Sequence, residues 1–404
     1  MVAEASVPNI ALGEAYRVGK TLVPPRLRLI VFSTIYFAAM GYFVLLGFTQ
    51  PYMNWDMLGY VGSVTEWSTS DPEQVYAKTM QAARKVSSIS LFHAYLDNPL
   101  SARSDAFAQE LPLYQVKPLY NALVWVVGHR VSLPAATWIV SASSFALLSV
   151  LLFAWYPHHM AREVWLTILV ALAVLWRFPM SHLAQLSTPD CVAMLLQMAA
   201  IYAWMRRQSF ILFALFCWLA CLARPDALFL SLALAICFAL QAQERAIPVL
   251  QTCGLVLVLV ITCAAITHFS WYSYSQFFIH SYVDRRPFPG QLTEQLTLGR
   301  YWNTLASSCV LFVKAPRQIA MVVLSLFAGV CYCFKAAENR HNLLLLIAAW
   351  VALAVRFMLF PAWGDDRYYF TYWVPILFAC GELMTPGASV LWKMQAHLLN
   401  IRSL

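Results

Sequence analysis

The sequence predicts an all-α polytopic membrane protein, with about ten transmembrane helices and further helices on its surface. Of its 404 residues, 61% are hydrophobic and only 11% are charged, and the mean hydropathy is +0.63. Soluble domains carry roughly 25% charged residues. Apolar runs of about 20 residues, the length that crosses a hydrocarbon core, recur along the chain. We therefore expect a single transmembrane domain over residues 1–404.

The first elements follow from the charges that flank the first apolar run. Residues 29–48 are apolar and follow several basic residues, which favour the cytoplasm. No convincing small-residue cleavage site follows, so we expect a retained helix that leads outward. The first extracytoplasmic loop is expected at residues 51–133, because its initial part, up to Lys117, is polar. Residues 118–128 are apolar but too short to span, which predicts a helix on the membrane surface.

The next segments are expected to alternate between the two sides of the membrane. Residues 134–156 predict an inward span and residues 164–176 an outward span, followed by an external loop at 177–189. Residues 190–205 predict a further inward span. This span ends at two arginines, residues 206–207, a strong cytoplasmic stop signal.

The apolar run 210–240 is too long for one span and is interrupted by Arg-Pro-Asp at 224–226. Because proline breaks the helical hydrogen-bond ladder, we expect two short helices that meet at an external turn. Residues 269–317 predict a second large extracytoplasmic segment, on the same side as the first, part of which dips into the membrane. The remaining spans are expected at residues 247–267, 319–334, 343–360 and 368–384.

Several function classes do not fit the charges and cysteines. The net charge of +8 is explained in part by basic cytoplasmic segments, and no basic face interleaved with aromatics predicts a nucleic-acid partner. The ten cysteines lie mostly in apolar runs and indicate small buried residues. Neither they nor the histidines show ligand spacing, so no metal site or cofactor is assigned, although a metal ion is not excluded.

Two carboxylates stand at predicted boundaries of the membrane. Asp56 comes shortly after the first span, where its proton affinity suits general-base chemistry or its side chain caps the next helix. Asp190 ends the sequence Ser-Thr-Pro-Asp at the start of a span, which is good helix-start chemistry. For each of the two residues, helix capping and a part in the chemistry stay open as alternatives.

Cations at the outer ends of spans oppose the positive-inside tendency. An arginine in the apolar zone costs about 2.5 kcal/mol or more unless it is paired. Arg224 has Asp226 as a possible partner, Arg367 has Asp365 or Asp366, and Arg356 shows no evident one. The alternative, which we favour, is bidentate binding of a phosphate at the membrane boundary.

Two further cations are candidates outside the spans. Lys117 opens the predicted surface helix and either extends to lipid head groups or supplies a charge to the same phosphate. Arg285 lies in the second external segment. It is a candidate for substrate binding or for contact with anionic lipid.

In this order the motifs resemble the GT-C superfamily of membrane glycosyltransferases, such as protein O-mannosyltransferases and lipid A aminoarabinose transferases. The resemblance rests on short motifs spread over most of the chain: Trp55-Asp56-x-x-Gly59-Tyr60, Lys117-Pro118-Leu119-Tyr120, Asp190, Arg224 and Arg367-Tyr368. The chain departs from the pattern at Met57, where many relatives carry a second acidic residue, and it lacks a second proline after Pro118.

The resemblance implies a GT-C-like fold and an inverting transfer of a sugar from a polyprenyl-phosphate donor to an acceptor hydroxyl of a glycolipid, polysaccharide or protein. The implied roles are catalysis by Asp56 and Asp190, donor-phosphate binding by Lys117, Arg224, Arg367 and Tyr368, and substrate binding by Tyr60, Tyr120, Asp226 and Arg285. A polysaccharide polymerase and a flippase or transporter of lipid-linked sugars are the alternatives. The scarcity of glycosylation sequons favours a bacterial inner membrane, with the site facing the periplasm.

Overall fold

The chain folds almost entirely into helices. The computed structural model describes residues 25–155, 169, 177–241, 246–268, 272–333, 340–361 and 367–384. This part is 83% helical and has no strand, and one isolated bridge joins Tyr52 to Leu186. The predicted all-α class is therefore confirmed.

Five helices are long and apolar enough to cross a membrane. They are α2 (Pro25–Thr49), α9 (Leu133–Ala154), α15 (Ala246–His268), α18 (Pro316–Cys333) and α19 (Arg340–Leu359). Shorter helices with apolar stretches of 10–17 residues accompany them, namely α8 (Pro118–Gly128), α13 (Phe210–Ala223), α14 (Ala227–Gln241) and α20 (Arg367–Met384). These helices are compatible with a membrane protein. The described ranges thus hold five long candidates, and the expected span 164–176 lies outside them apart from residue 169.

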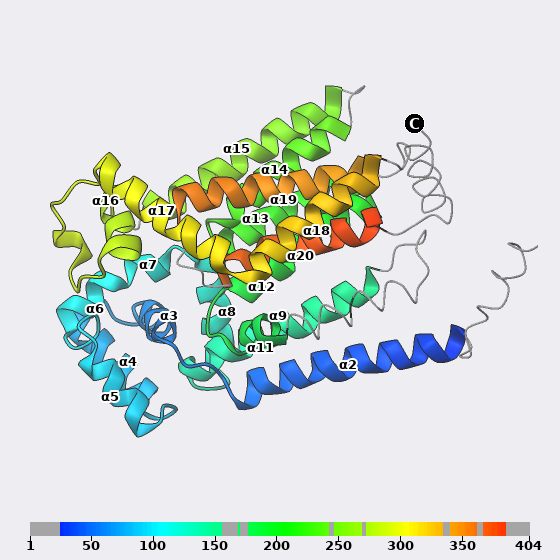
Figure 1. Cartoon of the computed structure of the whole chain (residues 1–404). Helices are drawn as coiled ribbons and strands as arrows, with labels where there is room; N and C mark the ends of the chain where they lie inside the picture. Colours follow the sequence, from blue (N-terminus) through cyan, green and yellow to red (C-terminus); the bar gives the residue numbers. More distant parts are fainter. Residues whose placement is uncertain are drawn as a thin grey trace, which may run out of the picture.

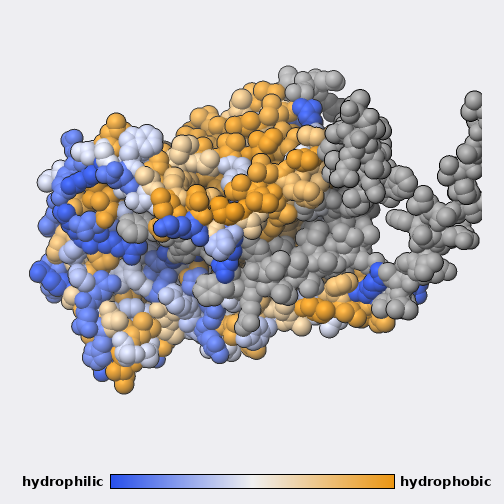
Figure 2. Space-filling view, in the orientation of Figure 1, coloured by the Kyte–Doolittle hydropathy of each residue, from blue (hydrophilic) through white to orange (hydrophobic). Residues whose placement is uncertain are grey.

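The long helices lie side by side in a bundle, and the small helices gather at one end of it (Figure 1). The surface of that end is largely hydrophilic, whereas the bundle shows a hydrophobic surface (Figure 2). We call this end the polar end. Its helices are α3 (Trp55–Thr65), α4 (Pro72–Arg84), α5 (Ile89–Asp97), α6 (Ser104–Glu110), α7 (Pro112–Gln115) and α16 (Tyr274–Phe278).

Local capping explains where several helices begin. The Asp71 side chain accepts a hydrogen bond from the backbone N–H of Glu73 at the start of α4, and Ser132 caps α9 in the same way. Ser273 and Gln276 form a reciprocal capping box at α16. Each contact satisfies a backbone donor that the first helical turn leaves without a partner.

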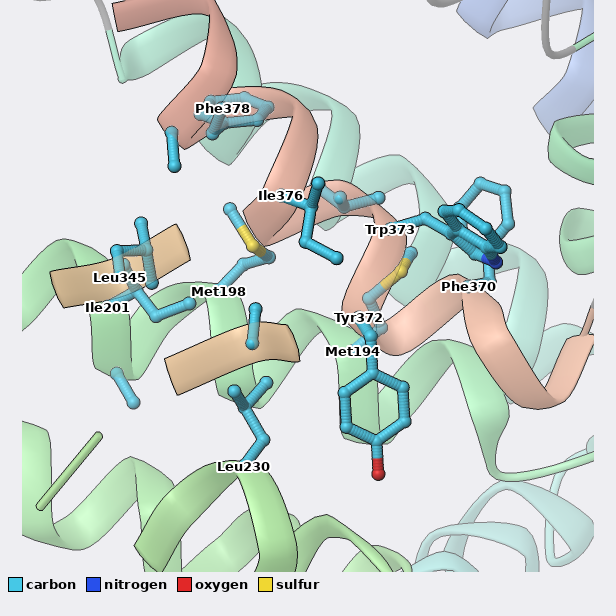
Figure 3. Close-up of a cluster of buried hydrophobic side chains, with 14 of the residues drawn as sticks. Met194, Met198, Ile201, Leu230, Leu345, Phe370, Tyr372, Trp373, Ile376 and Phe378 are labelled. Atoms are coloured by element: carbon cyan, nitrogen blue, oxygen red, sulfur yellow. The ribbon is translucent and has the colours of Figure 1, made fainter. Parts of the chain in front are cut away.

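The bundle has a core of interlocking apolar side chains (Figure 3). It is built around α12 (Asp190–Tyr202), which continues into the π-helical turn η1 (Ala203–Arg207). Met194 and Met198 of α12 are buried with Leu230 of α14 and Trp373 of α20. This packing holds Asp190, the first residue of α12, in place relative to Arg367, the first residue of α20.

The segment at 177–189, which we expected to be an external loop, contains a helix instead of irregular backbone alone. It begins with helix α11 (Arg177–Gln185), in which Met180, Leu183 and Ala184 are buried and which packs against α2 and α9. These three positions follow the i, i+3, i+4 spacing of one helical face. Three apolar residues in a polar segment are too few to predict a helix from the sequence. In contrast, α8 has the predicted bounds 118–128, and α13 and α14 are separated at 224–226 as expected.

The two predicted extracytoplasmic segments contact each other directly. The second one contains α16, the π-helical turn η2 (Ile279–Val283), the 3-10 turn η3 (Pro289–Gln291) and α17 (Leu298–Lys314). Tyr272 donates a hydrogen bond to the carbonyl of Gln109, and the Nε2 of His280 lies 3.2 Å from the Oε2 of Glu110. Both segments therefore belong to the same end of the molecule.

Candidate functional site

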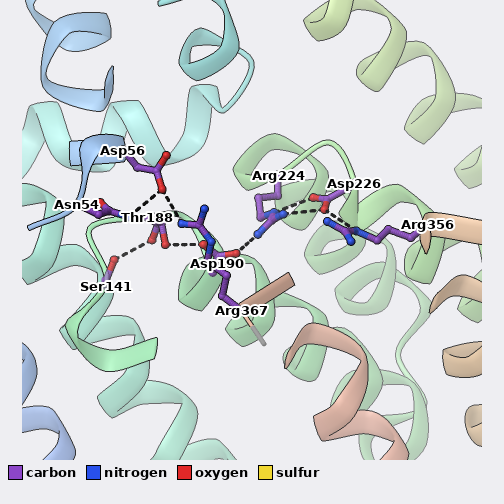
Figure 4. Close-up of polar contacts among 9 residues, drawn as sticks. All are labelled: Asn54, Asp56, Ser141, Thr188, Asp190, Arg224, Asp226, Arg356 and Arg367. Carbon is purple, nitrogen blue, oxygen red and sulfur yellow. Dashed lines mark hydrogen bonds and ion pairs between the residues drawn. The ribbon is translucent and has the colours of Figure 1, made fainter. Parts of the chain in front are cut away.

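A cluster of charged side chains lies where the polar end meets the bundle, and Figure 4 draws all of its members except Lys117. It combines residues from the start of α3, the segment before α8, the start of α12, the turn between α13 and α14, the end of α19 and the start of α20. We call it the charge cluster, and its members are Asp56, Lys117, Asp190, Arg224, Asp226, Arg356 and Arg367. Six of the seven are linked by the ion pairs given below.

Asp56 is held by three donors. Arg367 Nη1 donates to Asp56 Oδ2 at 2.5 Å, Asn54 Nδ2 donates to the same oxygen at 2.8 Å, and the Tyr114 hydroxyl donates to Oδ1 at 3.1 Å. Burial alone would raise the pKa of Asp56, but Arg367 and Lys117 hold it below its usual range. Asn54, not Asp56, occupies the N-cap of α3. Asp56 is therefore an ionised carboxylate directed at a cation, and the capping explanation is wrong.

Arg224 lies between two carboxylates. Its Nε and Nη2 donate to the two oxygens of Asp226, both at 2.7 Å, and its Nη1 pairs with Asp190. Thr188 donates to the other oxygen of Asp190, whose side chain is almost fully buried. Asp190 is the first residue of α12, and the cap position belongs to Pro189. The helix-cap explanation of Asp190 is therefore replaced by an ion pair.

The other two arginines are also paired inside the protein. Arg356 is 2% exposed, and its Nε lies 3.7 Å from Asp226 Oδ2. Arg367 pairs with Asp56, whereas its expected partners at 365–366 lie outside the described residues. Internal pairing, the less favoured of the two alternatives, is thus what the structure contains.

Lys117 differs from the arginines. Its Nζ donates to the carbonyl oxygen of Leu113 at 2.5 Å and lies 5.1 Å from the ring centroid of Tyr114 and 5.5 Å from that of Tyr60. It forms no ion pair with any carboxylate of the described residues. Burial and the neighbouring Arg224 lower the pKa of Lys117 to about 8. Among the described side chains of the cluster, four cations thus stand beside three carboxylates.

Tyrosines form an aromatic wall beside this cation. The Tyr60 ring stands perpendicular to Tyr114 at 5.0 Å and packs edge-on against Tyr120 at 4.8 Å. Tyr120 is fully buried, and its hydroxyl donates to the carbonyl of Thr137. Tyr60 therefore borders the charge cluster, whereas Tyr120 supports it from behind.

The remaining predicted residues are not part of the cluster. Arg285 is exposed in the segment after η2, and none of the contacts within the cluster involves it. The backbone of Tyr368 lies in the first turn of α20, but its side chain is outside the described atoms. A small, partly open pocket adjoins the cluster and is lined by Ala193, Arg224, Asp226, Ala227, Thr371 and Tyr372.

Three residues of the site were not predicted from the sequence: Asn54, Tyr114 and Thr188. Asn54 and Thr188 each precede a predicted carboxylate by two residues, which was a usable signal for a local hydrogen bond. Tyr114 precedes Lys117 by three residues, about one helical turn. Within the described part of the chain, no group of three or more His, Cys, Asp or Glu side chains is arranged to hold a metal ion.

Comparisons with protein-family models, with curated proteins and with solved structures found no match for this chain. The resemblance to the GT-C superfamily therefore rests on the sequence motifs alone. What the charge cluster does is inferred from its own geometry, burial and charge.

Proposed function

We propose that this chain is an integral membrane glycosyltransferase that moves a sugar from a polyprenyl-phosphate donor to an acceptor hydroxyl, with inversion at the anomeric carbon. One observation carries the proposal. An ionised carboxylate, Asp56, lies in a cluster whose described side chains include four cations and two further carboxylates, at the junction of the polar end and the apolar bundle.

The position of the cluster suits a lipid-borne substrate. Side chains such as Leu257 of α15 and Leu326 of α18 are more than half exposed on the bundle, which is expected where a helix faces lipid. A polyprenyl phosphate has its tail in the hydrocarbon and its charged group at the boundary. The charge cluster lies at the corresponding level of the molecule, in the extracytoplasmic half of the proposed topology.

The proposed reaction is a single displacement. Asp56 takes the proton of the acceptor hydroxyl, the acceptor oxygen forms a bond with the anomeric carbon, and the bond from that carbon to the phosphate oxygen breaks. The lipid phosphate leaves with the electron pair, opposite the attacking oxygen. Lys117 and Arg367 stabilise the charge that develops on the leaving phosphate, which lowers the barrier electrostatically.

The arginines keep their internal partners while they take part. A guanidinium has five N–H donors in one plane, so Arg367 can bind a phosphate while it still contacts Asp56. The Asp190 side chain is only 5% exposed and is engaged by Thr188 and Arg224, whereas the Asp56 side chain is 22% exposed. This favours a role in orienting Arg224 toward the phosphate over direct participation in proton transfer.

The test uses the purified full chain in lipid nanodiscs with a panel of radiolabelled polyprenyl-phosphate and polyprenyl-diphosphate sugars and candidate hydroxyl acceptors. We expect transfer from a monosaccharide monophosphate, and we expect Asp56→Asn to abolish it in a protein that still folds and inserts into the membrane, with a lower unfolding temperature because Arg367 loses its charged partner. Asp71→Asn is the matched control, because Asp71 is an exposed helix cap at the polar end.

The rival functions give different results in the same experiment. A polymerase consumes only diphosphate-linked oligosaccharides, and a flippase moves lipid-linked sugar without breaking a bond. Either result contradicts the proposal. Wild-type turnover by the Asp56→Asn variant removes the assignment of the base.

A further inference from the structure

The Tyr114 hydroxyl, which belongs to another helix than Asp56, donates a hydrogen bond to Asp56 Oδ1. The other oxygen, Oδ2, is shared by Arg367 and Asn54, whereas Tyr114 reaches Oδ1 from α7 across a 3.1 Å hydrogen bond. A carboxylate with both oxygens engaged has a fixed orientation. The direction in which Asp56 faces an acceptor therefore depends on Tyr114.

The same ring also contacts Lys117. The Nζ of Lys117 lies 5.1 Å from the Tyr114 centroid, within the range in which a cation is attracted to an aromatic face. The backbone of Tyr114 is tied down in turn, because Asn121 Nδ2 donates to its carbonyl oxygen at 3.1 Å. One side chain thus positions the proposed base and the proposed phosphate-binding cation relative to each other.

The position of the Tyr114 ring depends on Gly59 of α3, because glycine has no side chain to occupy that space. A Cβ atom built on Gly59 would lie 2.4–2.5 Å from three ring atoms of Tyr114, which is closer than real Cβ contacts come. Any other residue at position 59 forces the ring to move. Gly62, one turn along the same helix, is also crowded, by Leu111 and Phe107, which a Cβ would approach to 2.7 Å.

From this geometry we propose that Tyr114 is a positioning residue for glycosyl transfer, and that Gly59 provides the space its ring needs. The inference rests on the proposed function. Tyr114 acts through Asp56 and Lys117 and takes no part in bond making. Its hydroxyl keeps the carboxylate of Asp56 turned toward the acceptor, and its ring keeps Lys117 beside the leaving phosphate.

Tyr114→Phe tests the hydroxyl while keeping the ring. We expect kcat to fall about 10- to 100-fold, the loss of one hydrogen bond to a charged group, and KM for the donor to change less than twofold. The hydrogen bond favours ionised Asp56, so its loss raises the pKa of this base. The acidic limb of the kcat/KM profile should therefore move to higher pH, a shift that a merely structural residue would not cause.

Gly59→Ala tests the ring position independently. It should lower kcat and also raise KM for the donor, because the displaced ring disturbs Lys117 as well as Asp56. In the double variant with Tyr114→Phe, the two effects should be strongly non-additive. Gly62→Ala is the matched steric control. It crowds α3 to a similar degree but should leave the acidic limb in place and should combine additively with Tyr114→Phe.

The failure of this inference is distinguishable from failure of the proposed function. If Asp56→Asn is inactive while Tyr114→Phe keeps the wild-type kcat and acidic limb, Tyr114 has no positioning role and the glycosyltransferase proposal stands. Additive effects of Gly59→Ala and Tyr114→Phe likewise overturn the link between them. If the Asp56→Asn variant turns over normally, Asp56 is not the base, and Tyr114 then has no base to position.

Discussion

Lys117 is the member of the charge cluster whose charge changes near neutral pH. Burial and Arg224 lower its pKa to about 8, so its positive charge is present below pH 8 and is lost as the pH rises further. A polyprenyl-phosphate sugar is a phosphodiester with a constant charge, so the pH dependence of its binding comes from the protein. The affinity for the donor should be constant below about pH 7 and fall by up to tenfold per pH unit above 8.

Equilibrium binding of a non-reactive phosphonate analogue of the donor, measured from pH 6 to 9.5, checks this expectation. Lys117→Arg is the control, because a guanidinium stays charged over the whole range. Its binding curve should be flat. The same decline above pH 8 in Lys117→Arg would show that another group controls donor binding.

At the scale of single residues, the sequence predicted which charged residues need an explanation better than it predicted their partners. Asp56, Lys117, Arg224 and Arg367 were selected because charge at a membrane boundary needs a reason, and all four lie in one cluster. The pair of Arg224 and Asp226 follows from their spacing, but the pair of Arg367 and Asp56 was not predictable. Arg367 and Asp56 are 311 positions apart, and a single sequence carries no signal for a contact of that range.

Helix α2 provides a test of packing within one element. A Cβ on Gly47 would lie 2.5 Å from the carbonyl oxygen of Ala184 and 2.9 Å from the Cβ of Ala142, whereas a Cβ on Gly41 meets nothing within 4 Å. Gly47→Ala should therefore destabilise the protein by about 1–3 kcal/mol through overpacking. Gly41→Ala should be neutral or slightly stabilising, because alanine is the better helix former. Thermal unfolding midpoints in detergent compare the two, and equal midpoints would contradict the close approach of α2 to α9 and α11.

The elements most reliably predicted were those with a clear local signal. Pro118 begins α8, and Pro225 separates α13 from α14, because proline limits where a helix can continue. The helix α11 was missed for the opposite reason. Its buried stripe is only one turn long, and the partners that make it a helix, α2 and α9, come from elsewhere in the chain.

At the scale of the whole molecule, both polar segments lie at one end, and α12 with η1 leads away from it. The 18 residues from Asp190 to Arg207 span roughly 27 Å of helix. The exposed cysteines are first replaced by serine. Ser70→Cys and Thr293→Cys should then react together with a membrane-impermeant maleimide added outside sealed vesicles that keep the membrane's native orientation. Arg207→Cys should react only after permeabilisation. Labelling of Ser70→Cys and Thr293→Cys from opposite sides would contradict the arrangement of the two segments.

The four cations of the cluster also bear on how each catalytic cycle ends. The proposed donor is a diester and carries one negative charge, whereas the released polyprenyl phosphate is a monoester that carries up to two near neutral pH. Electrostatic attraction then favours the spent carrier over the incoming one. For the proposed reaction we therefore expect release of the carrier to limit turnover and free polyprenyl phosphate to inhibit competitively with the donor.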